Sequence, residues 1–370
     1  MKKAKAAGFL KLIAFLLIAT TLLCVFGFSA GGWQPITNSD LNSDNATQPS
    51  GEVDANKDLP NDTPTELPPP TVEVKYYDYL TGLAVSEEDT YLQKTAFVMN
   101  SGGPVYGLSM GEVVIEFPTE SGQTRLLMYT KATNELGKIG SIAPTRPFIS
   151  ALTSSFGGVL IALGEDGTRG SDGSGDGGDF FDLSKAPGYS YTEYTHYVYS
   201  NHALIMAGLQ NNGFSLLNTE NKTLPYTIST AQSFKNDGTL SAKNAILSFS
   251  ATKSTELRFS DDDLRYYLYE NGIKKTDALY EKAVSFKNVF VLFSDSVTYE
   301  SADSSELVLD TMGSGRGYYI SDGVATEITW QNESGAMTFK KINGEKLTVS
   351  AGESYIGFLK SSERNSLTLS

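Results

Sequence analysis

Cysteine and histidine are scarce in this sequence, and both shortages narrow the chemistry available to it. One of the 370 residues is a cysteine, Cys24, and two are histidines, His196 and His202. A lone cysteine cannot form an intramolecular disulfide, and Cys24 lies in an apolar segment at the start of the chain. Two histidines leave little material for a zinc site. We therefore expect no cofactor and no metal centre.

Basic residues are also in deficit, with 29 Lys and Arg against 43 Asp and Glu, which gives a formal net charge of -14. A surface of that sign repels a phosphate backbone, so we expect no nucleic-acid partner. Apolar residues, in contrast, make up 40% of the 370 residues. That is enough for packed cores, and the length suits two domains of ordinary size.

Residues 1–30 have the pattern of a membrane-targeting segment. Lys2, Lys3, Lys5 and Lys11 precede or enter an apolar run at residues 12–30. Positive charge in front of an apolar segment stays in the cytoplasm, so the chain after it is exported. The run is about as long as a short membrane-spanning helix. We expect a signal peptide or an N-terminal membrane anchor, with the globular part outside the cytoplasm.

Three fates of this segment are open. Lipidation at Cys24 needs a small residue directly before it, but Leu23 stands there. Cleavage near Ser29 or Ala30 would suit the small residues Gly27 and Ser29. We favour the third fate, an uncleaved helix that anchors the protein in the cell membrane.

Residues 31–75 have the composition of a linker. They are rich in Asn, Asp, Ser, Thr and Pro, and three prolines occur together at residues 68–70. So few apolar residues cannot offset the conformational entropy lost on ordering. We expect a disordered acidic linker that tethers the globular part to the membrane.

Residues 76–235 are expected to form a mixed α/β domain. Residues 95–99, 111–117 and 124–129 are rich in β-branched or aromatic residues, and Gly or Pro separates them, which indicates strands. Pro147 at the start of a periodic apolar segment predicts a helix over 147–156. A short buried strand over 159–163 and a second helix over 203–209 complete this part.

Residues 244–366 are expected to form a second, β-rich domain, after a boundary within residues 218–238. Three dipeptides predict type I′ hairpin turns, because both central positions of that turn need positive φ: Asn271-Gly272, Asp322-Gly323 and Asn343-Gly344. Strands are predicted at residues 266–269, 288–293, 317–320, 327–330, 337–340, 346–349 and 355–359. One weak helix, over 261–264 or 277–282, is left open.

These patterns predict an α+β fold, in which a mixed α/β N-terminal domain is followed by a mainly antiparallel β C-terminal domain. Alternation of strands with helices supports the first part, and closely spaced hairpin signals support the second.

Several short motifs occur in order along residues 76–360. They are LTGLAV at 80–85, GQTR at 122–125, IGSIAPTR at 139–146, THYVY at 195–199, GIKKTD at 272–277, NV at 288–289, GSGRG at 313–317 and ITW at 328–330. The chain in this respect resembles the YerB-like family of bacterial extracytoplasmic proteins, many of them lipoproteins and all of unknown molecular function. The resemblance implies two domains. It also marks a departure, because Ala143 stands where the family has its first arginine.

Arg125 and Arg146 are the first candidate ligand-binding residues. Arginine offers a planar fork of donors that suits a carboxylate or a phosphate. Arg146 lies between Pro144 and Pro147 at a strand-to-helix junction, where an anion could also meet helix amides. The alternative is a structural salt bridge that ties a loop to the sheet.

His196, Tyr197 and Tyr199 are further candidates in an aromatic-rich segment. Aromatic rings that flank a polar group can stack against a sugar or a peptide. The alternative is an aromatic strand that packs on the sheet. His196 has no partner acid or nucleophile that the sequence reveals, so a catalytic base is not indicated.

The resemblance adds Asp277, Asn288 and Arg316, which occupy polar positions in the matched motifs. The glycine-rich run at 313–317 could hold an anion with backbone amides, but no helix follows it. A tight turn or a bulge is therefore favoured there. Ser250 and Lys253 have the spacing of penicillin-recognising acyl enzymes, but they follow a strand rather than lie on a helix, and we treat the match as chance.

Asp172, Asp176 and Asp179 lie in a loop rich in glycine and aspartate. Its oxygen-bearing side chains and glycine partly follow the spacing of a calcium loop. Position 12 of such a loop, however, is Leu183, where a bidentate glutamate belongs. We therefore favour a surface loop over a metal site.

These patterns contain no complete catalytic set. We expect a membrane-tethered binding or scaffold protein of the bacterial cell envelope, with another envelope protein, a peptide or a wall glycan as its partner. The alternative is an enzyme that acts on cell-wall glycan or peptide through a cleft in the first domain. In that case Arg146 and His196 would converge there with an acid such as Glu116 or Asp182.

Overall fold

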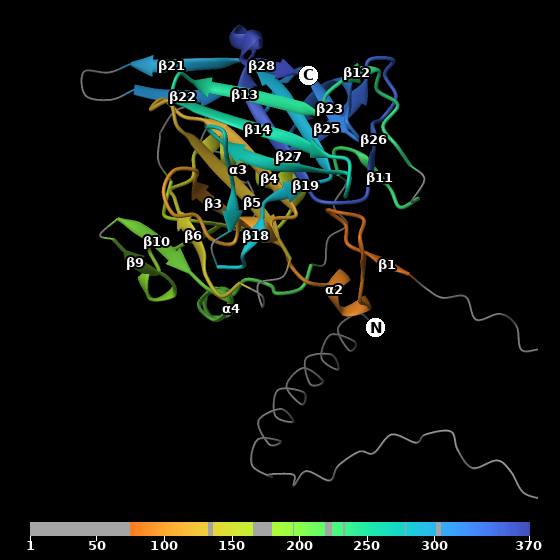
Figure 1. Ribbon diagram of the computed structural model, residues 1–370. Coiled ribbons are helices and arrows are strands. Elements are labelled where there is room, and N and C mark those ends of the chain that lie inside the picture. Colours follow the sequence, from red (N-terminus) through yellow and green to blue (C-terminus); the bar gives the residue numbers. More distant parts are fainter. Residues whose placement is uncertain are drawn as a thin grey trace, which may run out of the picture. The chain divides into compact units, whose positions relative to one another are not determined.

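The computed structural model describes residues 75–131, 136–165, 180–194, 196–218, 224–231, 234–277, 279–300 and 305–370. The expected anchor and linker, with Cys24, lie outside the described residues, and so do Asp172, Asp176 and Asp179. The described residues between 75 and 370 belong to one compact unit (Figure 1). Within the described ranges, no helix combines the length and the apolar character that crossing a membrane requires.

A large mixed sheet of 14 strands runs through this unit. The strands follow one another across the sheet in the order β12 (Leu240–Ser241), β24 (Val324–Glu333), β23 (Ser314–Ser321), β20 (Asn288–Ser294), β27 (Ser354–Lys360), β4 (Val113–Pro118), β5 (Thr124–Thr130), β3 (Thr95–Asn100), β6 (Ile139–Ile142), β10 (Tyr197–Ser200) and β9 (Tyr191–Glu193). Three strands pair off this path: β25 (Ala336–Lys341) with β24, β7 (Val159–Ala162) with β3, and β8 (Phe180–Asp182) with β7.

The two halves of the sequence meet inside this sheet. Strand β27 from the second half pairs in parallel with β4 from the first, in the register Ser354↔Val113 to Gly357↔Glu116. A smaller parallel pair also joins the two halves, with β11 (Thr227–Ser229) beside β26 (Thr348–Ser350). The hydrogen-bonded ladder is therefore continuous from one half of the chain to the other.

The predicted fold class is wrong. The chain is mainly β throughout, and its first half is not a mixed α/β domain. Its α-helices among the described residues are α2 (Glu87–Thr90), α3 (Pro147–Phe156) and α4 (His202–Asn211), with short 3₁₀ turns η1 (Leu108–Met110), η3 (Pro187–Tyr189) and η4 (Ser361–Ser366). The helices α3 and α4 were correctly predicted. Most first-half strands pair antiparallel, however, and antiparallel neighbours need no helix to connect them, so the first half has no helical layer over its sheet.

A second sheet packs against one face of the first. It has the order β16 (Ile273–Lys274), β15 (Arg265–Glu270), β14 (Lys253–Ser260), β13 (Asn244–Ser250) and β28 (Leu367–Leu369), with β19 (Ser285–Phe286) also on β15. One core lies between the sheets and contains Leu247, Leu257 and Tyr266 together with Val289 of β20. This burial explains why β13 alternates buried and more exposed positions.

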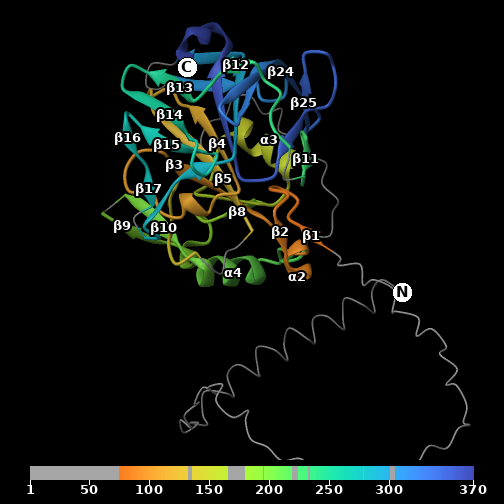
Figure 2. The same ribbon diagram turned by 45° about the vertical axis from the view of Figure 1, so that its right-hand side comes forward.

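The other face of the large sheet is covered by α3 and by loops. Phe148, Leu152 and Phe156 of α3 join Phe117 and Trp330 of the sheet in a second core. Figure 2 shows α3 near β25, and Ser155 Oγ donates to the carbonyl oxygen of Gly335, which follows β24, at 2.9 Å. Because both faces are buried, the central strands are continuous apolar runs rather than alternating ones.

Short hairpins complete the unit. Three two-stranded pairs lie beside the sheets: β1 (Tyr76–Tyr77) with β2 (Ala84–Val85), β17 (Thr276–Asp277) with β18 (Lys282–Ala283), and β21 (Ser296–Glu300) with β22 (Ser305–Leu309). The weak helix left open over 277–282 is therefore absent, since its ends pair as strands. Residues 261–264, the other option, form a turn between β14 and β15.

Two of the three predicted type I′ turns are confirmed. Asn271 and Gly272 have φ of 48° and 80°, and Asp322 and Gly323 have φ of 55° and 80°. The third prediction is wrong, because only Gly344 has positive φ, and its N–H donates to Lys341 O at 2.9 Å across a four-residue turn.

Candidate functional site

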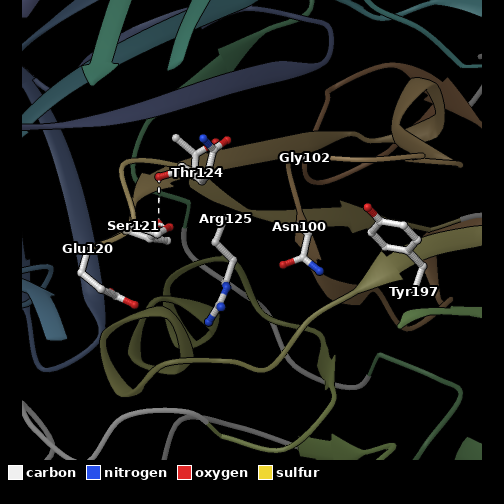
Figure 3. Close-up of a pocket in the computed structure, with 9 residues that line it drawn as sticks. Asn100, Gly102, Glu120, Ser121, Thr124, Arg125 and Tyr197 are labelled. Carbon is white, nitrogen blue, oxygen red and sulfur yellow. Dashed lines mark hydrogen bonds between the residues drawn. The ribbon is translucent and has the colours of Figure 1, made fainter. Parts of the chain in front are cut away.

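A pocket of about 260 Å³ opens at the end of the first-half strands. Its lining comes from the end of β3, the starts of β5 and β10, and the turn between β4 and β5: Asn100, Gly102, Thr119, Glu120, Ser121, Gln123, Thr124, Arg125 and Tyr197. Figure 3 shows the Arg125 side chain between Glu120 and Asn100. The GQTR and THYVY motifs, about seventy residues apart in the sequence, thus contribute Arg125 and Tyr197 to one place.

The turn that carries part of this lining is fixed by the second half of the chain. Gly122 has a φ of 74°, a conformation that glycine adopts without a steric penalty. Its carbonyl oxygen accepts a hydrogen bond of 2.7 Å from Ser250 Oγ at the end of β13. Ser250 therefore serves the turn, while Lys253 binds Glu270 at 2.6 Å. The serine–lysine spacing has no catalytic geometry here.

Arg146 reaches the rim of the pocket through an ion pair. Its Nη2 lies 2.8 Å from Oε1 of Glu120, and only 7% of its side chain is exposed. Arg146 is the residue before α3, and Pro147 occupies the first turn, so the helix start orients the guanidinium. The other oxygen of Glu120 accepts from Leu307 N at 3.5 Å.

The carboxylate of Glu120 is held in its charged form. Partial burial raises its pKa, but backbone hydrogen bonds and the Arg146 guanidinium outweigh this and bring the pKa below the ordinary value. Arg146 is therefore a cation whose intramolecular counter-ion lines an open pocket. An anionic ligand there would compete with Glu120 for the same fork of donors.

Tyr197 forms one wall of the pocket by packing on a glycine. A Cβ at Gly103 would lie 2.8 Å from the Tyr197 ring, so that close approach depends on glycine. Asn100, beside it, donates from Nδ2 to Ser141 Oγ at 3.1 Å. His196 is exposed, with its ring centroid 4.1 Å from that of Tyr197, but it does not line the pocket.

Tyr199 has a structural role rather than a ligand-binding one. It is buried, and its hydroxyl donates to Pro104 O at 3.1 Å. Lys138 Nζ lies 4.1 Å from the ring centroids of both Tyr199 and Tyr106 and pairs with Glu193 at 2.7 Å. Burial raises the pKa of Tyr199 to about 12, so it stays neutral. Its hydrogen bond fixes the loop after β3 at Pro104, and its ring does not line the pocket.

Asp277 and Asn288 are also buried within the fold. Asp277 accepts from both N and Oγ of Ser109 at 3.3 Å and so ties β17 to η1. Asn288 Nδ2 donates to Ser350 O at 2.9 Å, and its Oδ1 accepts from Tyr319 OH at 2.9 Å. Neither residue lines the pocket. Their places in the motifs are explained by hydrogen bonds between elements.

Arg316 lies elsewhere, on the outward face of β23. It is exposed and pairs with Glu327 at 3.1 Å. The neighbouring glycines of the GSGRG motif have a packing role, since a Cβ at Gly315 would overlap Phe293 O and lie 2.6 Å from Trp330 Nε1. Trp330 crosses that gap and donates to Phe293 O at 3.0 Å. The predicted turn or bulge is instead a regular strand.

The acids considered for catalysis are engaged elsewhere. Glu116 is buried between the halves, accepts from Thr255 Oγ1 at 2.9 Å and Tyr355 OH at 2.6 Å, and lies 3.5 Å from Lys253 Nζ. Asp182 accepts from Ser184 N at 2.9 Å and pairs with Lys185. Neither acid lines the pocket, and no cluster of metal-binding side chains occurs in the parts of the chain that the structure describes.

The sequence did not reveal a second buried charge cluster. Lys94 pairs with Asp78 and, at 2.8 Å, with Glu112, and all three are buried. Asp78 Oδ1 also accepts from the backbone N–H of Leu80 and Thr81 at 2.9 and 3.0 Å. The LTGLAV motif is therefore the turn that Asp78 organises. In the sequence, this cluster was signalled only by an acid two residues before a Leu-Thr-Gly turn.

Comparison with known proteins agrees with this arrangement. A family model described as the N-terminal domain of DUF3048, a protein of unknown function, matches residues 80–215, and the C-terminal domain of DUF3048 matches residues 245–356. No curated protein matches the chain. The crystal structure of the YerB protein from Bacillus subtilis is similar, with a TM-score of 0.69 and 19% identity over 80% of this chain and 100% of that one. This confirms the resemblance seen in the motifs: the chain belongs to the YerB-like family, whose two DUF3048 domains are of unknown function.

Proposed function

We propose that this protein is a membrane-tethered, extracytoplasmic binding or scaffold protein of the bacterial cell envelope. One observation carries the binding role: Arg125 and Tyr197, from two separate family motifs, line one open pocket beside the Arg146–Glu120 ion pair. The lysine-rich, apolar N-terminus and the acidic linker of the sequence support the location.

The lining suits a ligand that carries a carboxylate and several hydroxyl or amide groups. Arg125 supplies a planar fork of charged donors, and Asn100 and Gln123 supply amides. The Tyr197 ring supplies an aromatic wall of the kind that packs on a sugar or a peptide plane. A peptide or a wall glycan with a free carboxylate fits this set, and its carboxylate would compete with Glu120 for Arg146.

Binding is favoured over catalysis by the chemistry of the same residues. The described lining contains no histidine, lysine or cysteine that could act as a base or a nucleophile. Its one acid, Glu120, is committed to Arg146 and has a lowered pKa, which does not suit a general acid.

Calorimetric titration with muramyl dipeptide, which carries both a sugar and a peptide carboxylate, tests the proposal. We expect wild-type protein to bind and Arg125→Gln to bind about tenfold more weakly, since one charge-assisted contact is lost. Glu120→Gln is expected to bind more tightly, because its amide no longer competes for Arg146. A matched control is Arg258→Gln, a half-buried arginine that pairs with Glu256 away from the pocket.

Two results would contradict the pocket as the ligand site. One is the absence of binding by folded wild-type protein at millimolar ligand. The other is equal loss of affinity in Arg125→Gln and Arg258→Gln, which would indicate a general effect of charge. Circular dichroism of each variant checks that the fold is retained.

A further inference from the structure

A second pocket lies on the outward face of β23, β24 and β25, toward the other end of the large sheet. Figure 1 labels β23 and β25, and Figure 2 labels β24 and β25. It has a volume of about 370 Å³. Its lining is polar and basic: Ser314, Gly315, Arg316, Thr329, Trp330, Gln331, Thr338, Lys340 and Arg364. The candidate site of the first half shares none of these residues. The two pockets are therefore separate sites.

Strand register places the polar side chains in two rows. Arg316 pairs with Thr329, and Thr329 pairs with Lys340, so these three form one row across adjacent strands. Ser314, Gln331 and Thr338 form the next row in the same way. Residues between the rows point to the core, as buried Trp330 and Phe339 show. Side chains at alternate positions share a face, so both rows face outward.

Three cations line this pocket, while Glu327 and Glu333 lie beside it on the same outward face of β24. Arg316, Lys340 and Arg364 are all exposed, and the lining contains no acid. Arg364 comes from η4, and its guanidinium lies 5.7 Å from the ring centroid of Phe293. Glu327 pairs with Arg316 at 3.1 Å, but both side chains are largely exposed, so the pair is weak and exchangeable.

The geometry suits a chain of anionic groups better than a single anion. Arg316 and Lys340 lie on the outer two of three adjacent strands, so their backbones are about 10 Å apart. The two long side chains could converge on one anion, but an extended polymer can offer Arg316, Lys340 and Arg364 a separate anionic group each. Hydroxyl and amide groups in the second row supply hydrogen bonds to a hydroxylated polymer backbone.

We propose that this face, the β23–β25 face, binds an anionic glycopolymer, a hydroxyl-bearing chain that carries repeated phosphate or carboxylate groups. The net charge of -14 opposes non-specific attraction of any polyanion, so binding depends on the local cations. The site is separate from the pocket of Arg125 and adds a second binding activity to the molecule.

Binding of full-length protein to immobilised poly(glycerol phosphate) tests this proposal. Wild-type protein is expected to bind, and a triple variant with Arg316→Gln, Lys340→Gln and Arg364→Gln is expected to lose affinity by at least about tenfold. The matched control removes three exposed charges elsewhere, with Lys185→Gln, Lys243→Gln and Lys282→Gln. It should stay within about twofold of wild type. Arg125→Gln should also bind normally, which separates this test from that of the first pocket.

The polymer used as probe distinguishes the chemistry. Neutral dextran is not expected to bind at this face, and inorganic phosphate is expected to bind much more weakly than the polymer, because it pairs with fewer of the three cations. Single-stranded DNA of matched charge is expected to bind at least about tenfold more weakly, because it lacks the hydroxyl groups that the Ser314 row contacts. Thr338→Val should weaken binding to poly(glycerol phosphate) and leave binding to inorganic polyphosphate unchanged.

Three outcomes would overturn the proposal. Unchanged binding by the triple variant would place the polymer elsewhere. Equal loss in the Lys185, Lys243 and Lys282 control would reduce the effect to net charge. Equal affinity for DNA would show that hydroxyl contacts play no part.

Discussion

At the scale of single residues, the buried cluster of Lys94, Asp78 and Glu112 makes the stability of the fold depend on pH. One ammonium group faces two carboxylates, so the cluster has surplus negative charge when both acids are ionised. Burial raises the pKa of Glu112 to about 7, and neighbouring Asp78 adds to this, although Lys94 lowers it. Asp78, which faces Lys94 and the turn amides, has a pKa below its ordinary value despite burial. Glu112 is therefore the acid that takes up a proton.

The raised pKa of Glu112 predicts stability that falls as pH rises. Between pH 4.5 and about 7 the folded state holds a proton that the unfolded state releases, so the free energy of unfolding decreases across that window. The change is on the order of 3 kcal/mol, since one pKa unit corresponds to about 1.4 kcal/mol. Glu112→Gln should remove this part of the pH dependence, as urea unfolding at several pH values would measure.

The matched control is Glu333→Gln, which alters an exposed glutamate at the end of β24. It should keep the wild-type pH dependence. The contribution of Asp78 changes only below about pH 4, outside the window, because its pKa is lowered. Identical slopes for wild type and Glu112→Gln would refute the assignment.

At the scale of elements, the packing of β23 on β20 depends on a missing side chain. Gly315 leaves the space in which Trp330 donates to Phe293 O. Gly315→Ala should therefore destabilise the fold by about 1–3 kcal/mol, the usual cost of overpacking a core. Denaturant unfolding measures the loss, and the emission of Trp330 should shift as its indole is displaced.

Gly188→Ala is the control for this substitution. Gly188 lies in η3, its φ is not positive, and a Cβ there meets no atom within 4 Å. Its effect on unfolding should be within about 0.5 kcal/mol, as for other surface changes. If Gly315→Ala were equally mild, the steric explanation of the GSGRG motif would fail.

Local elements were largely predictable from the sequence. Pro147 and its apolar periodicity gave α3 with the right bounds, and Asn271-Gly272 gave a hairpin turn of the right type. The turn at Ser334 and Gly335, with φ of 52° and 84°, was missed because serine seldom adopts that conformation. Fold class failed for a different reason. A strand shows which of its faces are buried, but not which distant strand pairs with it.

Functional residues could be predicted by type but not by partner. Both arginines were singled out, yet nothing in the sequence linked Arg146 to Glu120, which lies 26 residues earlier in the chain. Asp277 and Asn288 were proposed as ligand groups, but each has a buried structural role that only the distant Ser109 and Tyr319 reveal. The local sequence around a polar residue does not show whether it will be buried.

At the scale of the molecule, the two halves should unfold as one. The β4–β27 ladder and the network around Glu116 cross from one half to the other. Val291→Ala in β20 leaves a cavity in a fully buried site and should cost about 2 kcal/mol. Hydrogen exchange measured by mass spectrometry should show the same loss of protection in β5 of the first half.

A different exchange pattern would contradict joint unfolding of the two halves. Two independently folding domains would lose protection in β20 and keep it in β5. An exposed substitution in the same half, Lys346→Ala, is the control and should leave the protection of both strands unchanged.

The parallel pairing of β4 with β27 also has a consequence for how the protein is made. Synthesis completes β4 at Pro118 and reaches the start of its partner only at Ser354. At typical rates of chain growth, that interval is on the order of tens of seconds. Throughout it, one side of an apolar strand lacks its neighbour, and such open strand edges pair readily with other chains. A newborn chain of this protein is thus dependent on shielding until its last strands emerge.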